Sequence, residues 1–83
     1  MQPGDVLLKK LSSRFEPSSL INFRFRGKDV LVKTDDQGNA TLAFIGKMND
    51  DGVVKGDRYN RKLIFNADGS VLKDHWDYKG KVR

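Results

Sequence analysis

The chain contains no cysteine, one histidine and two prolines among its 83 residues. Without cysteine, disulfide bonds and thiolate catalysis are excluded, and with a single histidine a tetrahedral zinc site is almost excluded. No apolar run approaches the ~18–20 residues of a membrane-spanning helix, and the first residues lack the basic and apolar segments of a signal peptide. From these absences we expect a cytoplasmic protein with no membrane association.

The length and the apolar content together predict one small folded domain. A chain of 83 residues has no room for two independent cores, and its hydrophobic fraction of 37% is sufficient for folding. A domain of this size buries only about 60–65% of its unfolded surface, so its architecture should be simple. We therefore predict a single domain over residues 1–83 whose stability depends on aromatic and β-branched packing.

The charge balance is basic and evenly distributed. Sixteen lysines and arginines against eleven aspartates and glutamates give a formal net charge of +5, with no separate basic tail or acidic body. Such a balance favours encounters with anions, among them nucleic acid and acidic proteins. It is equally typical of soluble proteins that bind neither.

Alternation and turn composition predict a series of β-strands. Residues 21–26 alternate apolar and polar side chains at period two, as a half-buried strand does. Gly56 lies within a segment that is long for one strand, which indicates a bulge or bend and, we expect, two pieces. Glycine-containing turns separate the segments, and the basic residues 79–83 either extend the last strand or fray. The predicted strands cover residues 21–26, 29–34, 40–48, 53–65 and 70–78.

The N-terminal residues 1–18 form either a helix or an extended segment. Leu7, Leu11 and Phe15 recur at helical spacing, with Asp5 as a possible cap and Pro17 as the stop. An extended strand over residues 5–11 is the alternative. We favour the helix, covering one open end or face of a β-meander formed by residues 19–78. The predicted fold is mainly β: about five antiparallel strands in meander order, as a curled sheet or a small, partly open barrel.

Catalytic chemistry is not indicated. His75 is flanked by Asp74 and Asp77, but on a strand it points away from Asp74 and Trp76, so these neighbours cannot orient its ring. The serines lie in no nucleophile motif, and no glycine-rich loop matches a phosphate-binding pattern. We therefore predict that the protein is not an enzyme, and we keep a hydrolytic or small-molecule role at His75 only as a minor hypothesis.

Two acidic clusters carry oxygen ligands of the kind that calcium prefers. Neither follows the order of an EF-hand loop, and aspartate and asparagine are also the usual residues of hairpin turns. We therefore expect neither a metal nor a cofactor. The clusters are Asp35, Asp36 and Asn39, and Asn49, Asp50 and Asp51.

The basic residues form the most useful pattern. Arg24 and Arg26 share one face of the first strand with Asn22, whereas Arg58 and Lys62 share a face with Asn60. Such rows suit a phosphate backbone, and exposed aromatic side chains could add base stacking. The candidate nucleic-acid-binding residues are Arg24, Arg26, Arg58, Lys62, Tyr78, Lys79, Lys81 and Arg83.

Whether the aromatic residues of the last two strands are exposed depends on strand register. If the turn over residues 66–69 pairs Phe65 with Ser70, Tyr59 lies opposite Trp76. If it pairs Asn66 with Ser70, Asn60 lies beside Trp76 and the aromatic residues sit on a polar surface. Turn chemistry favours the second register, but a slip of one residue reverses the outcome, so the question stays open for Tyr59, Trp76 and Tyr78.

Two classes of function follow from these patterns. The first is a small, basic, non-catalytic binding module that contacts nucleic acid with little sequence selectivity. The alternative is a protein-interaction or structural β module that acts through an edge strand or as a homodimer, with an acidic protein or a second copy as its partner.

Overall fold

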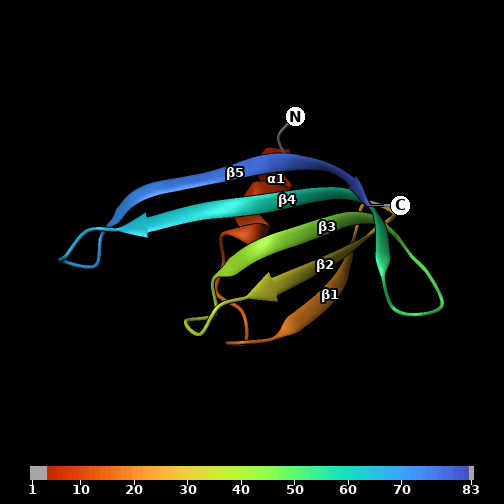
Figure 1. Cartoon of the computed structure of the whole chain (residues 1–83), viewed down its shortest axis with the longest axis horizontal. Helices are drawn as coiled ribbons and strands as arrows, with labels where there is room; N and C mark the ends of the chain where they lie inside the picture. Colours follow the sequence, from red (N-terminus) through yellow and green to blue (C-terminus); the bar gives the residue numbers. More distant parts are fainter. Residues whose placement is uncertain (1–3, 83) are drawn as a thin grey trace.

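The chain forms a five-stranded antiparallel sheet with one short helix on one of its faces (Figure 1). The computed structural model describes residues 4–82. Strand order follows the sequence, β1-β2-β3-β4-β5, and β1 does not pair with β5, so the sheet is open and curled rather than a closed barrel. The predicted five-stranded meander is confirmed. The elements are α1 (Asp5–Leu11), β1 (Leu20–Phe25), β2 (Lys28–Thr34), β3 (Ala40–Met48), β4 (Val54–Phe65) and β5 (Val71–Val82).

Period-two alternation sends one set of side chains toward the helix. In β1 the apolar residues Ile21 and Phe23 are half-buried, whereas the polar residues between them are exposed. Phe23 lies opposite Val30 of β2, and Val30 lies opposite Ile45 of β3. Because directly opposed residues share a face of the sheet, these side chains form one apolar layer. We call the face that α1 covers the inner face.

The core lies between α1 and the inner face. Leu7 and Leu11, one helical turn apart, pack against apolar side chains of β2, β3, β4 and β5. Leu11 has no exposed surface, and neither do Val30 and Val32 beneath it. The buried cluster consists of Leu7, Leu11, Val30, Val32, Ala40, Ala43, Ile45, Tyr59 and Trp76.

The helix is confirmed, but it is shorter than its apolar spacing predicts, and the expected cap at Asp5 is wrong. Gly4 is the N-cap residue, no side chain caps the helix, and α1 ends at Leu11 rather than near Glu16. The reason is tertiary: the amide of Phe15 donates to the carbonyl of Gly38 at 2.9 Å, which ties this segment to the β2–β3 turn. A Cβ at Gly38 would lie 2.3 Å from the Phe15 carbonyl oxygen, so the close approach requires glycine.

β4 is one continuous strand, and the expectation of two pieces is wrong. Gly56 pairs with Gly46 of β3 on one side and with Val82 of β5 on the other, so the ladder runs through the glycine. A Cβ at Gly46 would lie 2.0 Å from the Lys55 carbonyl oxygen, and a Cβ at Gly56 would lie 2.2 Å from that of Ile45. The two glycines therefore let the backbones approach closely where β4 bends (Figure 1).

A bulge in β5 decides where the aromatic residues point. The turn forms as predicted, with the Asn66 amide donating to the Ser70 carbonyl at 2.7 Å. The register then shifts by one residue at Leu72, because Phe65 pairs with Val71 whereas Ile64 pairs with Lys73. Beyond the bulge Tyr59 lies opposite Tyr78, so both rings face the core. The polar-surface register that turn chemistry favours is therefore wrong for this part of the strand pair.

Candidate functional site

The face of the sheet opposite α1 is covered by no other element of the described chain, and we call it the outer face (Figure 1). Strand pairing fixes its membership, because residues directly opposite one another project to the same side. Leu31, Phe44 and Arg58 form one such row across β2, β3 and β4. The outer-face residues that matter below are Arg24, Asp29, Leu31, Lys33, Leu42, Phe44, Arg58, Asn60, Lys62, Lys73, His75, Asp77 and Lys79.

Apolar side chains occupy the centre of the outer face. Leu31, Leu42 and Phe44 are half-buried although no element covers them. Leu31 lies opposite Phe44, while Leu42 lies opposite Lys33 on one side and Asn60 on the other. Phe44 is the one aromatic side chain that the described residues place on this face. We call Leu31, Leu42 and Phe44 the apolar stripe.

Unpaired cations lie on the same face as this stripe. Two acidic side chains lie on the outer face, but Asp29 already pairs with Arg24 at 2.9 Å and Asp77 with His75 at 2.5 Å. The remaining cations are exposed and make no ion pair or side-chain hydrogen bond within the described part of the chain, so the face carries an excess of positive charge. We call them the five cations: Lys33, Arg58, Lys62, Lys73 and Lys79.

Arg24 and Arg26 do not share a face, contrary to the prediction from alternation. Arg24 lies on the outer face, but its guanidinium is held by Asp29 and by the Gly27 carbonyl at 3.0 Å. Arg26 lies beyond the end of β1, in the turn, with φ of 51°. Its guanidinium lies 5.3 Å from the centroid of the Phe25 ring. The alternation of apolar and polar residues continues through Arg26, but the strand ends at Phe25. Alternation alone therefore did not reveal where the turn begins.

Tyr78 and Lys81 lie on the inner side of β5, apart from Arg58 and Lys62. The Tyr78 hydroxyl donates to Asp57 Oδ1 at 3.0 Å, and Lys81 Nζ lies 3.3 Å from the same atom. The hydrogen bond to Asp57 raises the pKa of Tyr78. The rings of Tyr59 and Tyr78 lie 5.4 Å apart, which adds to the core. Of the three aromatic residues considered for base stacking, Tyr59 and Trp76 are buried and Tyr78 is half-buried.

The remaining sequence-predicted cations fall into two groups. Arg58 and Lys62 do share a face with Asn60, and Lys79 follows them onto the outer face because it is adjacent to the inward-pointing Tyr78. Arg83 lies outside the described residues. Sequence reasoning missed Lys33 and Lys73. Because Asp29, Leu31 and Lys33 alternate along one strand, the outer-face position of Lys33 could have been predicted. The position of Lys73 on this face depends on the bulge at Leu72 and could not.

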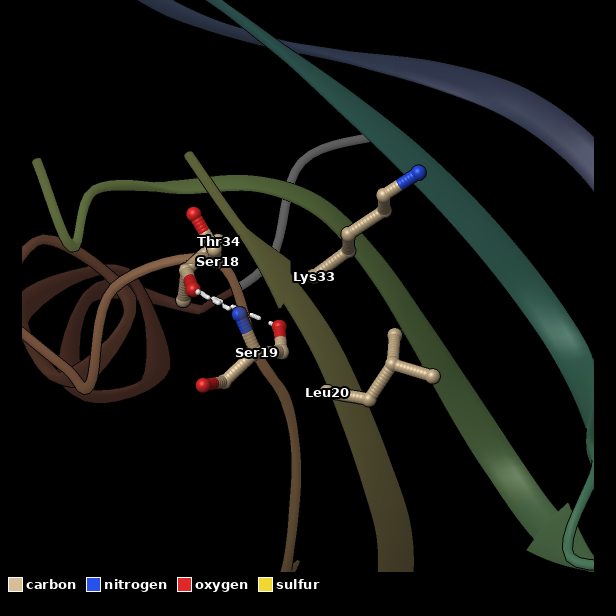
Figure 2. A pocket seen from close by; sticks show the side chains of 5 residues that line it. All are labelled: Ser18, Ser19, Leu20, Lys33 and Thr34. Carbon is tan, nitrogen blue, oxygen red and sulfur yellow. Dashed lines mark hydrogen bonds between the residues drawn. The ribbon is translucent and has the colours of Figure 1, made fainter. Parts of the chain in front are cut away.

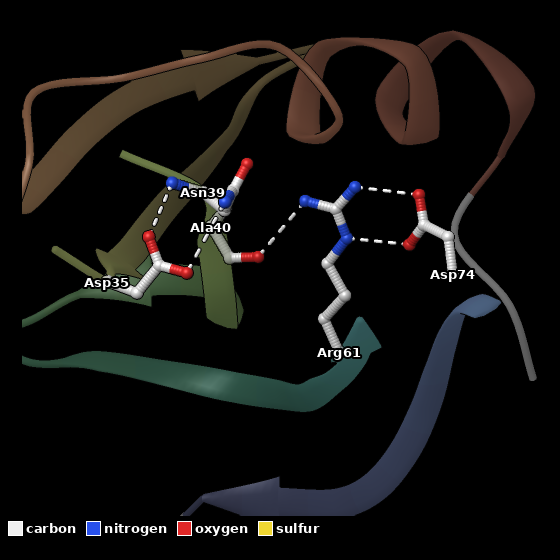
Figure 3. A network of polar contacts seen from close by, with 5 residues as sticks. All are labelled: Asp35, Asn39, Ala40, Arg61 and Asp74. Carbon is white, nitrogen blue, oxygen red and sulfur yellow. Dashed lines mark hydrogen bonds and ion pairs between the residues drawn. The ribbon is translucent and has the colours of Figure 1, made fainter. Parts of the chain in front are cut away.

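An ion pair between a buried arginine and a partly exposed aspartate links β4 to β5 on the inner face (Figure 3). Arg61, whose side chain is 4% exposed, donates from Nε and Nη2 to the two carboxylate oxygens of Asp74, both at 2.7 Å. Its Nη1 donates to the Ala40 carbonyl at 3.3 Å, and the guanidinium lies 5.7 Å from the Trp76 ring. The hydrogen bonds from Arg61 hold the pKa of Asp74 below its ordinary value. The guanidinium of Arg61, the carboxylate of Asp74 and the carbonyl of Ala40 are therefore already hydrogen-bonded to one another.

The acidic clusters considered as calcium ligands serve the turns. Asp35 Oδ1 accepts from the amide of Gln37 at 2.9 Å. It also accepts from the amide of Asn39 at 2.9 Å (Figure 3). Burial acts to raise the pKa of Asp35, but these amide hydrogen bonds outweigh it and lower the pKa. Asn49 Oδ1 accepts from two amides in the next turn, at 3.0 Å each. Among the described residues no group of three or more ionisable ligands is placed to hold a metal ion.

Among the hollows that the described residues form, two shallow ones have no contribution from His75. One, of about 290 Å³, is lined by Ser18, Ser19, Leu20, Lys33 and Thr34 (Figure 2). Its polar atoms are largely engaged, since Thr34 Oγ1 accepts from the Ser19 amide and donates to the Glu16 carbonyl. The other is lined by residues 47–50 and Lys55. Neither resembles the deep, mostly apolar cavity that encloses a small-molecule ligand.

No protein-family model matches the chain, and no curated protein or solved structure matches it significantly. Within residues 4–82 there is no helix long and apolar enough to cross a membrane. The outer face, with its cations and its apolar stripe, is therefore the candidate functional site on geometric grounds alone.

Proposed function

We propose that the protein binds single-stranded nucleic acid, with little sequence selectivity, on the outer face. The observation that carries this proposal is that five unpaired cations share an uncovered sheet face with the apolar stripe, with Lys33 and Arg58 directly beside it. A sheet face left open to water normally presents polar residues, so half-buried apolar side chains at its centre call for an explanation. A ligand with both anionic and flat apolar parts provides one.

The cations lie on both sides of the stripe. Lys33 lies on β2, next to Leu42, whereas Arg58 and Lys62 lie on β4, beyond Phe44 and Leu42. Four residues along a strand correspond to about 13 Å, so Arg58 and Lys62 can contact separate phosphates of one backbone. Because neither has a carboxylate partner among the described residues, binding a phosphate costs them no existing ion pair.

Phe44 supplies a surface for base stacking. Phe44 is half-buried and lies opposite Leu31 on one side and Arg58 on the other, so part of its surface remains available to a ligand. Stacking of a base on an aromatic side chain is worth about 1–3 kcal/mol and tolerates every base. The face offers few amide or hydroxyl groups for reading base edges, which is why we expect little selectivity. A duplex conceals its bases, so the stripe favours a single strand.

The first test measures binding of a labelled, mixed-sequence single-stranded DNA by fluorescence anisotropy at several salt concentrations. Arg58→Ala with Lys62→Ala should weaken binding and reduce the salt slope by about 1.4, since each phosphate contact on a single strand contributes about 0.7. The matched control is Lys9→Ala with Lys47→Ala, which removes the same charge from exposed positions off the outer face. Equal losses in the two double variants would contradict a defined site.

The second test addresses the aromatic contact. Phe44→Leu keeps the stripe apolar but removes the ring, and we expect about tenfold weaker binding with an unchanged salt slope, because the phosphate contacts are retained. A duplex of the same sequence should bind more weakly than the single strand. Stronger duplex binding, or a Phe44→Leu variant that binds like the parent protein, would contradict base stacking on this face.

A further inference from the structure

The β4–β5 hairpin projects beyond the rest of the sheet (Figure 1). The last pair between β3 and β4 is Leu42 with Asn60, so residues 61–76 continue as a ribbon of two strands, which we call the arm. Its tip exposes four large apolar side chains: Ile64 by 40%, Phe65 by 45%, Val71 by 55% and Leu72 by 65%. A two-stranded ribbon is only marginally stable in water and gains stability from a third strand.

β5 offers an edge at which such a third strand could pair. It pairs with β4 on one side, and no described strand pairs with its other side. Register shifts interrupt it at Leu72 and between Tyr78 and Lys81, where Gly80 has φ of 93°. Residues 73–78 between these bulges are regular, and a regular, exposed edge strand is a template for pairing with another chain.

We infer that β5 pairs antiparallel with β5 of a second copy of this chain, about a two-fold axis at His75. In this register Lys73 lies opposite Asp77 of the partner subunit, and the symmetry forms this oppositely charged pair twice. Both side chains are on the outer face of the sheet. Opposite charges directly across a strand pair stabilise it, so charge complementarity within the regular segment favours this axis.

Four of the five other symmetric registers centred within residues 73–78 bring like charges together, and the fifth, about Tyr78, pairs residues 73–77 with residues 79–83 across the bulge at Gly80 and so leaves the regular segment. An axis at Lys73, Asp74 or Asp77 places that residue opposite its own copy. An axis at Trp76 places Lys73 opposite Lys79 of the partner subunit. Like charges directly opposite each other destabilise a strand pair. The axis at His75 is therefore the one that the sequence of β5 selects.

Pairing in this register also supports the arm. In this register residues 73–76 of the arm lie opposite residues 74–77 of the partner subunit's β5, so the β5 side of the arm gains a third strand up to the bulge at Leu72. The two-fold axis runs perpendicular to the sheet, because antiparallel strands in one sheet are related in that way. Both outer faces then point to the same side and both helices to the other. The inference does not depend on the proposed nucleic-acid binding.

Sedimentation equilibrium of the purified chain over a range of concentrations tests the dimer by charge exchange. Lys73→Asp alone or Asp77→Lys alone should weaken dimerisation about tenfold, because each replaces two attractive pairs with two repulsive ones. The double variant K73D/D77K should restore it, since the pairs re-form with exchanged signs. Lys33→Asp, which makes the same charge change on the outer face at β2, is the control. Circular dichroism verifies that each variant is folded.

Cysteine cross-linking locates the axis. The chain has no cysteine, so His75→Cys introduces a single thiol that lies beside its own copy at the two-fold axis, within reach of a short bis-maleimide. Asn22→Cys, on the exposed face of β1 at the opposite edge of the sheet, is the matched control. Rapid dimer formation by H75C but not by N22C supports the inference. A monomer at all concentrations, failure of the double variant to recover, or equal cross-linking of both thiols would overturn it.

Discussion

The Arg61–Asp74 ion pair on the inner face is a place where removing one charge should strongly destabilise the protein. Asp74→Asn keeps the shape of the side chain but leaves the guanidinium of Arg61, which is 4% exposed, without its counter-charge. Breaking a fully buried pair in this way costs about 3–5 kcal/mol. Because the Asp74 side chain is 33% exposed, water can partly replace the lost carboxylate, and we expect a loss of about 2–3 kcal/mol in unfolding free energy.

Urea unfolding followed by tryptophan fluorescence measures this loss directly. Trp76 is the one tryptophan of the chain, is 3% exposed, and lies beside Arg61, so its emission reports the unfolding of this region. Asp36→Asn is the control, since it removes the same charge from an exposed position in the β2–β3 turn. If Asp74→Asn is no more destabilising than Asp36→Asn, the pair does not fasten the hairpin and the reasoning is refuted.

The same variant should change the dependence of stability on pH. Hydrogen bonds from Arg61 lower the pKa of Asp74 in the folded state, below an unfolded value of about 3.9. The ionised carboxylate therefore contributes stability that is fully present above that value and is lost as the pH falls through the folded pKa. The parent protein should lose stability more steeply below about pH 4 than Asp74→Asn does. Parallel curves for the two proteins would contradict this assignment.

Three further predictions concern the core and the bend of the sheet, and each is measured by chemical denaturation. Gly46→Ala should cost about 3 kcal/mol, because its Cβ would meet the Lys55 carbonyl oxygen at 2.0 Å; a loss below about 1 kcal/mol would mean that the strands separate easily there. Leu11→Ala should cost about 3 kcal/mol through the cavity left under α1, and an unchanged midpoint would show that the helix is not docked. Tyr78→Phe should cost about 1 kcal/mol by removing the hydrogen bond to Asp57, with a neutral result arguing against that bond.

Local pattern in the sequence determined the strands, their order and, for the first strand, which side chains form the core layer. The alternation of Ile21 and Phe23 with polar residues sends one set of side chains to one face regardless of what covers it. Glycine-containing turns then connect neighbouring strands, so a meander is the simplest arrangement. Arg58 and Lys62 were recognisable as neighbours on one face for the same reason, because their spacing is even and the strand between them is regular.

The tertiary structure alone decided features that depend on a shift of one residue or on distant contacts. The bulge at Leu72 reverses which side chains of β5 face the core. The alternation of apolar and polar residues along a strand does not predict where such an extra residue is inserted. For the same reason Tyr78 joined the core while Lys73 joined the outer face. The helix stops at Leu11 because Phe15 bonds to Gly38, a contact between residues far apart in sequence. Sequence patterns report local geometry, whereas bulges and long-range hydrogen bonds are settled only when the whole sheet packs.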